Sequence, residues 1–153
     1  MTKVSYTELE VLYQRYQAQG LRILAFPCNQ LNQEEPGDID DIRTFARNGQ
    51  YPDLLPCEIG PPLCPMHNPT QSPRGDKYTH PGATFDVLDK IDAVNGPATH
   101  PLFAALKAAV GIETMQGNFN KFIVDRFGVP RLHFGKGIAP LQMDERIRGL
   151  LAE

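Results

Sequence analysis

The chain of 153 residues has the length of one ordinary domain, with 41% hydrophobic and 22% charged residues and a formal net charge of −3. A chain of this size buries about two-thirds of its unfolded surface, which is enough for a real core. The slight negative charge leaves no electrostatic footprint for nucleic acid, and no run approaches the ~18 apolar residues of a membrane helix. We therefore expect one domain over residues 1–153, with no nucleic-acid partner and no insertion into a membrane.

Residues 1–5 run straight into a helical pattern and have no signal-peptide core. Three cysteines in a chain of this length do not form a disulfide framework. Both features favour a reducing compartment, and we expect a cytoplasmic protein.

The first elements along the chain are a helix and a strand. Ser5 and Glu8 match a capping box, which predicts that the helix begins there. Leu9, Leu12, Tyr13 and Tyr16 then follow at the spacing of one buried helical face. The apolar run 21–26, ended by a proline, predicts a short strand that is buried on both faces.

A second helix and an irregular segment come next. Asp38 is a good N-cap for a helix in which Ile42 and Phe45 share a face and which ends at Gly49. Residues 51–82 hold more than half of the chain's prolines and show no apolar periodicity. We interpret this segment as a proline-rich surface insertion.

The last third of the chain predicts a strand, a helix, a hairpin and a final helix. Residues 85–91 form a plausible strand, and His100-Pro101 is typical of a helix start. Residues 121–125 and 129–134 flank a turn that contains Gly128, with Pro130 favouring an edge position for the second strand. Ile147, Leu150 and Leu151 mark the final helix.

Three ordered motifs carry a resemblance to a known family. The segment 24–30 reads LAFPCNQ and is followed by Glu-Pro-Gly at 35–37; residues 90–102 contain KID, VNG and HPL; and residues 118–125 read NFNKFIVD. These blocks resemble, in order and spacing, those of the glutathione peroxidase family. The resemblance covers nearly the whole chain outside 51–80, and it implies an α/β domain of thioredoxin-like fold, with a mixed central sheet flanked by helices.

The resemblance also implies that part of the family pattern lies ahead of Met1. In the family, a selenocysteine or cysteine precedes the first helix in a pattern whose threonine matches Thr2, so the nucleophile would fall two positions before Met1. The first, central strand of the fold would also be missing, between the strands expected at 21–26 and 121–125. We therefore expect the chain to be truncated and, as it stands, inactive.

Members of the family surround the nucleophile with a Gln, a Trp and an Asn, and this chain departs from that set. Asn118 matches the Asn, and its alternative role is merely to satisfy turn amides. The Gln position aligns with Glu34, while Gln33 stands one residue earlier and is the alternative donor. The Trp position aligns with Gly117, and the chain contains no Trp. A carboxylate beside a thiolate would raise the pKa of the thiol, so Glu34 would weaken such a site.

None of the three cysteines stands at the family's nucleophile position. Cys28 follows a predicted strand and is expected to be structural and buried. Cys57 and Cys64 are candidates for a resolving thiol, as in the thioredoxin-dependent branch of the family, or are simply surface thiols. A zinc site that joins them with His67 and His80 is disfavoured, because six residues separate the two cysteines. We expect no metal and no resident cofactor.

The function implied by the resemblance is reduction of hydroperoxides, with glutathione or thioredoxin as the reducing co-substrate. The alternative is a redox-silent binding module of thioredoxin-like fold, which the departures at Glu34 and Gly117 favour. A zinc-bound structural module is a third hypothesis. The short connection 111–117 resembles family members without the loop found in tetramers, so we expect a monomer.

Overall fold

A computed structural model describes residues 1–49 and 80–153 of the chain. Cys57, Cys64, His67 and most of the expected insertion at 51–82 lie outside the described residues. The elements, in chain order, are α1 (Thr2–Tyr16), the 3₁₀ turn η1 (Gln17–Gln19), β1 (Leu24–Ala25), α2 (Ile39–Asn48), β2 (Asp86–Val87), α3 (Pro101–Ala109), β3 (Lys121–Val124), β4 (Pro130–Phe134), η2 (Pro140–Met143) and α4 (Asp144–Leu151).

The strands form two separate pairs. β1 and β2 are parallel, with Leu24 opposite Asp86, whereas β3 and β4 are antiparallel, with Phe122 opposite His133. Among the described residues no strand joins the two pairs. This mixture of helices with parallel and antiparallel strand pairs agrees with the α/β fold that we expected.

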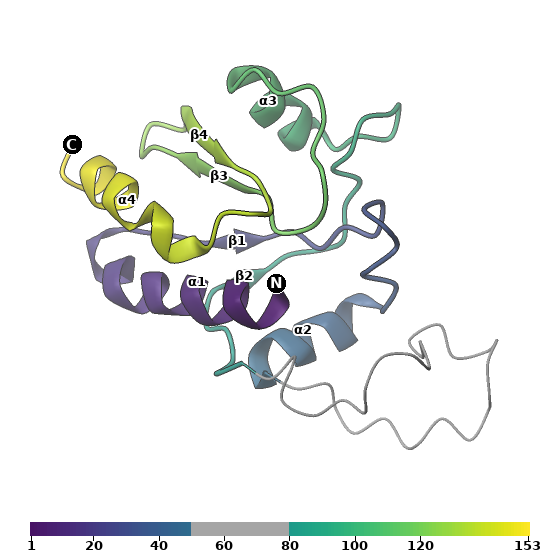
Figure 1. Cartoon of the computed structure of the whole chain (residues 1–153), viewed down its shortest axis with the longest axis horizontal. Coiled ribbons are helices and arrows are strands. Elements are labelled where there is room, and N and C mark those ends of the chain that lie inside the picture. The colour runs from purple at the N-terminus through teal and green to yellow at the C-terminus, as the bar shows by residue number, and fades with distance from the viewer. Residues whose placement is uncertain (50–79) are drawn as a thin grey trace.

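Alternate residues of β3 point into two different cores. Ile123 packs on a cluster of Leu12, Tyr16, Met143 and Ile147, which belongs to α1, η2 and α4. Phe122, the preceding residue, packs on a second cluster around Cys28 and Met115, next to Phe103 of α3. Because neighbouring side chains of a strand face opposite sides, the β3–β4 hairpin lies between α3 and the α1–α4 layer. Figure 1 shows these three layers.

Several expectations about element boundaries are confirmed. The Asp38 carboxylate accepts a hydrogen bond from the Asp41 amide at 2.9 Å, and α2 ends at Gly49 in the left-handed conformation. The His100 ring caps α3 by accepting from the Leu102 amide. The predicted hairpin is present as β3 and β4, and Cys28 is buried.

The capping box at Ser5 and Glu8 was wrong. α1 begins three residues earlier, and the Ser5 amide already donates to the Met1 carbonyl as an interior helical residue. Ser5 is completely buried, so its side chain packs on the core side of α1. Glu8 accepts instead from the Leu141 amide of η2 at 2.9 Å. The Ser and Glu therefore serve tertiary contacts, which outweigh the local capping pattern.

The expected strand 21–26 was also wrong in length and burial. β1 holds only two paired residues, and Leu24 is 53% exposed. Its hydrogen-bonded neighbour β2 is equally short, so the expected strand 85–91 reduces to Asp86–Val87. The apolar run had predicted a strand buried on both faces. A strand that is partly uncovered cannot bury both faces.

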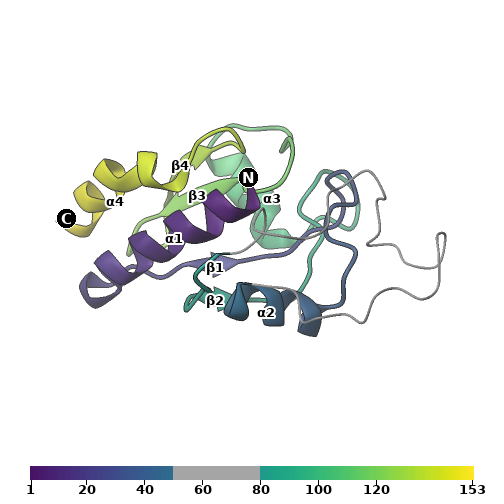
Figure 2. The same ribbon diagram turned by 60° about the horizontal axis from the view of Figure 1, so that its bottom comes forward.

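The final residues of the expected surface insertion lie in the interior. His80 is 8% exposed, its ring stacks on Tyr6 at 4.4 Å, and the edge of Phe45 meets it at 5.1 Å. The His80 amide donates to the Gly49 carbonyl, and the Ala83 amide donates to the Ala46 carbonyl. Residues 80–83 are therefore fastened to the end of α2 and to the buried face of α1 (Figure 2).

Candidate active site

The loops at the start of α1 bring two of the predicted site residues into contact. The Asn118 side-chain amide donates to a Glu34 carboxylate oxygen at 2.7 Å, across 84 positions of sequence. Asn118 lies in the loop before β3, and Glu34 in the loop between β1 and α2. The ring of Phe119 meets Tyr6 of α1 edge-on at 6.0 Å, which places this loop beside the first turns of α1 (Figure 1).

Gln33 is not drawn into this contact. Asn32 and Gln33 both have left-handed backbone angles, with φ of 59° and 53°, and both side chains are exposed. Within residues 1–49 and 80–153 the Gln33 side chain makes no hydrogen bond, whereas the Asn32 amide donates to Glu34. The residue that the structure brings to Asn118 is therefore Glu34.

The neighbouring Glu35 is held in a more buried position. Its backbone amide donates to the Asn29 side chain at 3.0 Å. Burial raises the pKa of the Glu35 carboxyl, and the nearby positive charge of Lys90 opposes that rise. The Lys90 ammonium donates to the Gly37 carbonyl, so both residues brace the turn that displays Glu34.

Lys136 occupies the space where a side chain at position 117 would lie. Gly117 has a φ of +73°, and a Cβ built on it would fall 2.3 Å from Lys136 Cδ and 3.0 Å from Lys136 Nζ. A Trp at this position would therefore need Lys136 to move as well as a left-handed backbone that L residues rarely adopt. The sequence contains no motif that would have pointed to Lys136.

A buried lysine fixes the loop that carries Lys136. The Lys121 ammonium donates to the carbonyls of Gly135 at 3.3 Å and of Ile138 at 2.5 Å. Burial lowers the pKa of Lys121, and the Glu8 carboxylate partly offsets that effect. The loop after β4 is thus tied to the first residue of β3, directly beside the Asn118 loop.

Cys28, the cysteine among the described residues, is not in a position to act as a nucleophile. Cys28 is buried, and its Sγ has a weak contact of 3.8 Å with the Gln30 side-chain oxygen. Gln30 in turn accepts from the Val94 amide, which gives this region a structural role. Among the residues that the structure describes, no group of three or more His, Cys, Asp or Glu side chains is placed to hold a metal ion. No helix of the described part is long and apolar enough to cross a membrane.

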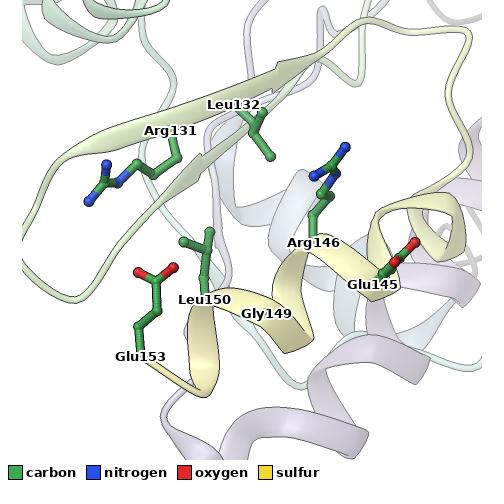
Figure 3. A pocket seen from close by; sticks show the side chains of 7 residues that line it. All are labelled: Arg131, Leu132, Glu145, Arg146, Gly149, Leu150 and Glu153. Carbon is green, nitrogen blue, oxygen red and sulfur yellow. The ribbon is translucent and has the colours of Figure 1, made fainter.

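One pocket lies apart from this site, whereas another, of about 450 Å³, is lined in part by Asn29 and Lys90, which contact the turn that carries Glu34. The first pocket, of about 400 Å³, lies between β4 and α4, lined by Arg131, Leu132, Glu145, Arg146, Gly149, Leu150 and Glu153 (Figure 3). It opens at the start of β4, whereas Lys136 follows the end of that strand. Figure 3 shows Arg131 and Arg146 on either side of the two leucines, with glutamates near both, so the charges of its lining largely cancel.

The fold and the site define a class of protein. Helices pack on both faces of the paired strands, which agrees with an α/β domain of thioredoxin-like fold. The crystal structure of T. cruzi GPX1 superposes on the chain with a TM-score of 0.61 and 28% sequence identity, over 99% of this chain and 74% of that one.

Sequence comparison then places the chain in one family. The family model for glutathione peroxidase matches residues 1–56. A probable phospholipid hydroperoxide glutathione peroxidase from Citrus sinensis is 34% identical, over 99% of this chain and 73% of the relative. A chloroplastic phospholipid hydroperoxide glutathione peroxidase from Pisum sativum is 33% identical, over 99% of this chain and 52% of the relative. The chain belongs to the glutathione peroxidase family of peroxide-reducing oxidoreductases.

Proposed function

We propose that this domain reduces hydroperoxides with electrons from a thiol, and that Asn118 is the neutral donor of its active site. The observation that carries the proposal is the position of Asn118, in a tightly held loop beside the first turns of α1. Neutral N–H donors aimed at developing negative charge are a main source of catalytic stabilisation. The family relationship supplies the reaction class.

The reaction that we propose has two half-reactions. A thiolate or selenolate attacks one peroxide oxygen, the O–O bond breaks, and the leaving oxygen takes up a proton to become an alcohol or water. The nucleophile is left as a sulfenic or selenenic acid. Two thiol equivalents, from glutathione or a thioredoxin, then reduce it, releasing water and a disulfide. The proposal needs no resident metal or cofactor, because the thiols supply both electrons.

Asn118 can serve this reaction only when its amide is available. In the present structure the amide donates to Glu34. A bound anion has to compete with that carboxylate for the same N–H, or accept from the second hydrogen of the amide. The negative charge of Glu34 disfavours an anion nearby, so we expect a slower enzyme than one with a neutral residue at position 34.

The same contact favours a second candidate, a redox-silent binding module. Glu34 occupies the donor, and Lys136 covers the Gly117 position from which another donor would act. Cys28 is buried at another place in the fold. If the domain is an active peroxidase, Cys57 and Cys64 remain candidates for its resolving thiol.

A peroxidase assay separates the two candidates. The protein to assay carries an apolar strand of about seven residues and then Cys-Gly ahead of Met1, which completes the family pattern. Its control has Ser in place of that Cys. Consumption of hydroperoxide that depends on the Cys and on added thiol supports the active enzyme. A folded protein without such turnover supports the redox-silent module, and turnover by the chain itself that is lost on Cys57→Ser assigns the nucleophile to Cys57.

We also propose that the domain is a monomer and works in the cytoplasm. The short connection 111–117 supports a monomer. Sedimentation of the protein at micromolar concentration tests its oligomeric state, and a dimer would contradict the proposal. The compartment is tested by localising a tagged protein in intact cells, where a signal in an organelle would contradict the proposal.

A further inference from the structure

The backbone is left-handed on both sides of Asn118, and on one side this conformation needs external support. Gly117 adopts its φ of +73° without strain because it has no Cβ, but Phe119 has a φ of +57°. A bulky L residue in the left-handed region is disfavoured by roughly 1–2 kcal/mol. Such outliers persist only where surrounding contacts over-determine them, and they gather at functional sites. The contacts that hold this loop therefore decide where Asn118 points.

Asn120 bridges the two ends of the loop. Its side-chain amide donates to the Gly117 carbonyl at 2.6 Å. Its side-chain oxygen lies 2.9 Å from Nε2 of His133. The Gly117 carbonyl can only accept, so the nitrogen of the Asn120 amide must face it and the oxygen must face His133. His133 consequently carries a hydrogen on Nε2 and is the donor in that bond.

His133 is itself fixed by the hairpin. It lies on β4, opposite Phe122 of β3, and its ring is 4.9 Å from the Phe122 ring. Burial and the positive charge of Lys121 both lower the pKa of His133. The neutral ring with its hydrogen on Nε2 and the imidazolium both donate through Nε2, so the bond to Asn120 survives a change of charge.

We propose that Asn120 and His133 are positioning residues, which act as a relay from the rigid hairpin to the Asn118 side chain. His133 orients the Asn120 amide, Asn120 holds the Gly117 carbonyl, and the left-handed turn then directs Asn118 toward Glu34. The role in catalysis rests on the proposed function, but the relay itself is a property of the chain as it stands. The sequence singled out neither residue for chemistry, although Asn120 lies inside the 118–125 motif.

The test reads the Asn118 side-chain amide directly by NMR in the unmodified chain. Asn120→Ala removes both bonds, and the side-chain protons of Asn118 should exchange with water about tenfold faster, the effect expected from losing one hydrogen bond. Asn95→Ala is the matched control, because Asn95 also makes two side-chain hydrogen bonds, to Glu113 and Lys107, outside this loop. That variant should leave Asn118 exchange unchanged.

A second pair of variants keeps the test independent of folding defects. His133→Gln retains an N–H donor near the place of Nε2 and should keep the slow exchange of Asn118. His133→Leu loses the donor with a similar loss of packing on Phe122, and it should reproduce the faster exchange of Asn120→Ala. Equal exchange at Asn118 in the Gln and Leu variants, or no change in Asn120→Ala, overturns the relay. Peroxide takes no part in this measurement, so a protein with an intact relay and no peroxidase activity would refute only the proposed function.

Discussion

Replacing Asn118 by Asp tests the contact at the centre of the site most severely. The substitution keeps the size of the side chain but exchanges the donor for a carboxylate, 2.7 Å from the carboxylate of Glu34. Two unit charges at that distance repel by about 1.5 kcal/mol even at the dielectric constant of water. Rotation of the side chains relieves part of this repulsion. We expect Asn118→Asp to be about 1 kcal/mol less stable at pH 7 than Asn118→Ala, which only loses the hydrogen bond.

Urea unfolding at a series of pH values measures the effect and its sign. Like charges raise the folded-state pKa values of the two carboxyls above their unfolded values of about 3.9 and 4.3. The extra destabilisation is therefore complete above those folded-state pKa values and disappears as the pH falls through them. In a Glu34→Gln background the difference should be absent at every pH. Equal stability of the Asp and Ala variants at pH 7, or a difference that persists at pH 3, refutes the contact.

Three further predictions concern stability. Burial lowers the pKa of His80, and the negative charge of Glu10 opposes this shift, so on acidification the unfolded chain binds the proton before the folded one does. The free energy of unfolding therefore falls as the pH drops below about 6.5. His80→Phe should reduce this dependence of stability on pH, as measured by urea unfolding, and an unchanged dependence contradicts the prediction. A Cβ at Gly49 would lie 1.8 Å from the His80 carbonyl oxygen, so Gly49→Ala should destabilise the fold by more than about 3 kcal/mol. A Cβ at Gly135 would meet nothing within 4 Å, so Gly135→Ala should cost about 1 kcal/mol or less. Similar melting temperatures for the two variants would be inconsistent with this packing. Asp38→Ala should cost about 1 kcal/mol and Asp38→Ser much less, and equal losses would argue against the cap.

The sequence predicted correctly those parts of the fold that depend on contacts between residues close together in the chain. Asp38 caps α2 and His100-Pro101 begins α3, because each cap is formed with amides two or three residues away. The β3–β4 hairpin follows from its turn and from strands that are adjacent in sequence. The order and spacing of the three motifs then identified the family, which no single element would have done.

The remaining features depend on partners distant in sequence. Ser5 was expected to cap a helix, but it faces the core, where burial of the α1 face decides. The exposure of Leu24 reflects a strand that, within the part of the chain that the structure describes, pairs only with β2. Lys136 meets Gly117 because two loops converge, and His133 meets Asn120 through the register of the hairpin. The contact between Glu34 and Asn118 joined two residues that had been singled out separately.

The reaction of the completed site with peroxide tests the central claim most directly. In the protein extended with Cys-Gly ahead of Met1, the second-order rate constant of that thiol with hydrogen peroxide is measured by stopped flow and compared with that of free cysteine at the same pH. One preorganised donor is worth about 10²–10³ in rate, so we expect an acceleration of at least about a hundredfold that Asn118→Ala largely removes. A rate equal to that of free cysteine, unaffected by Asn118→Ala, in a protein shown to be folded, would contradict the assignment of this loop as a peroxidase site.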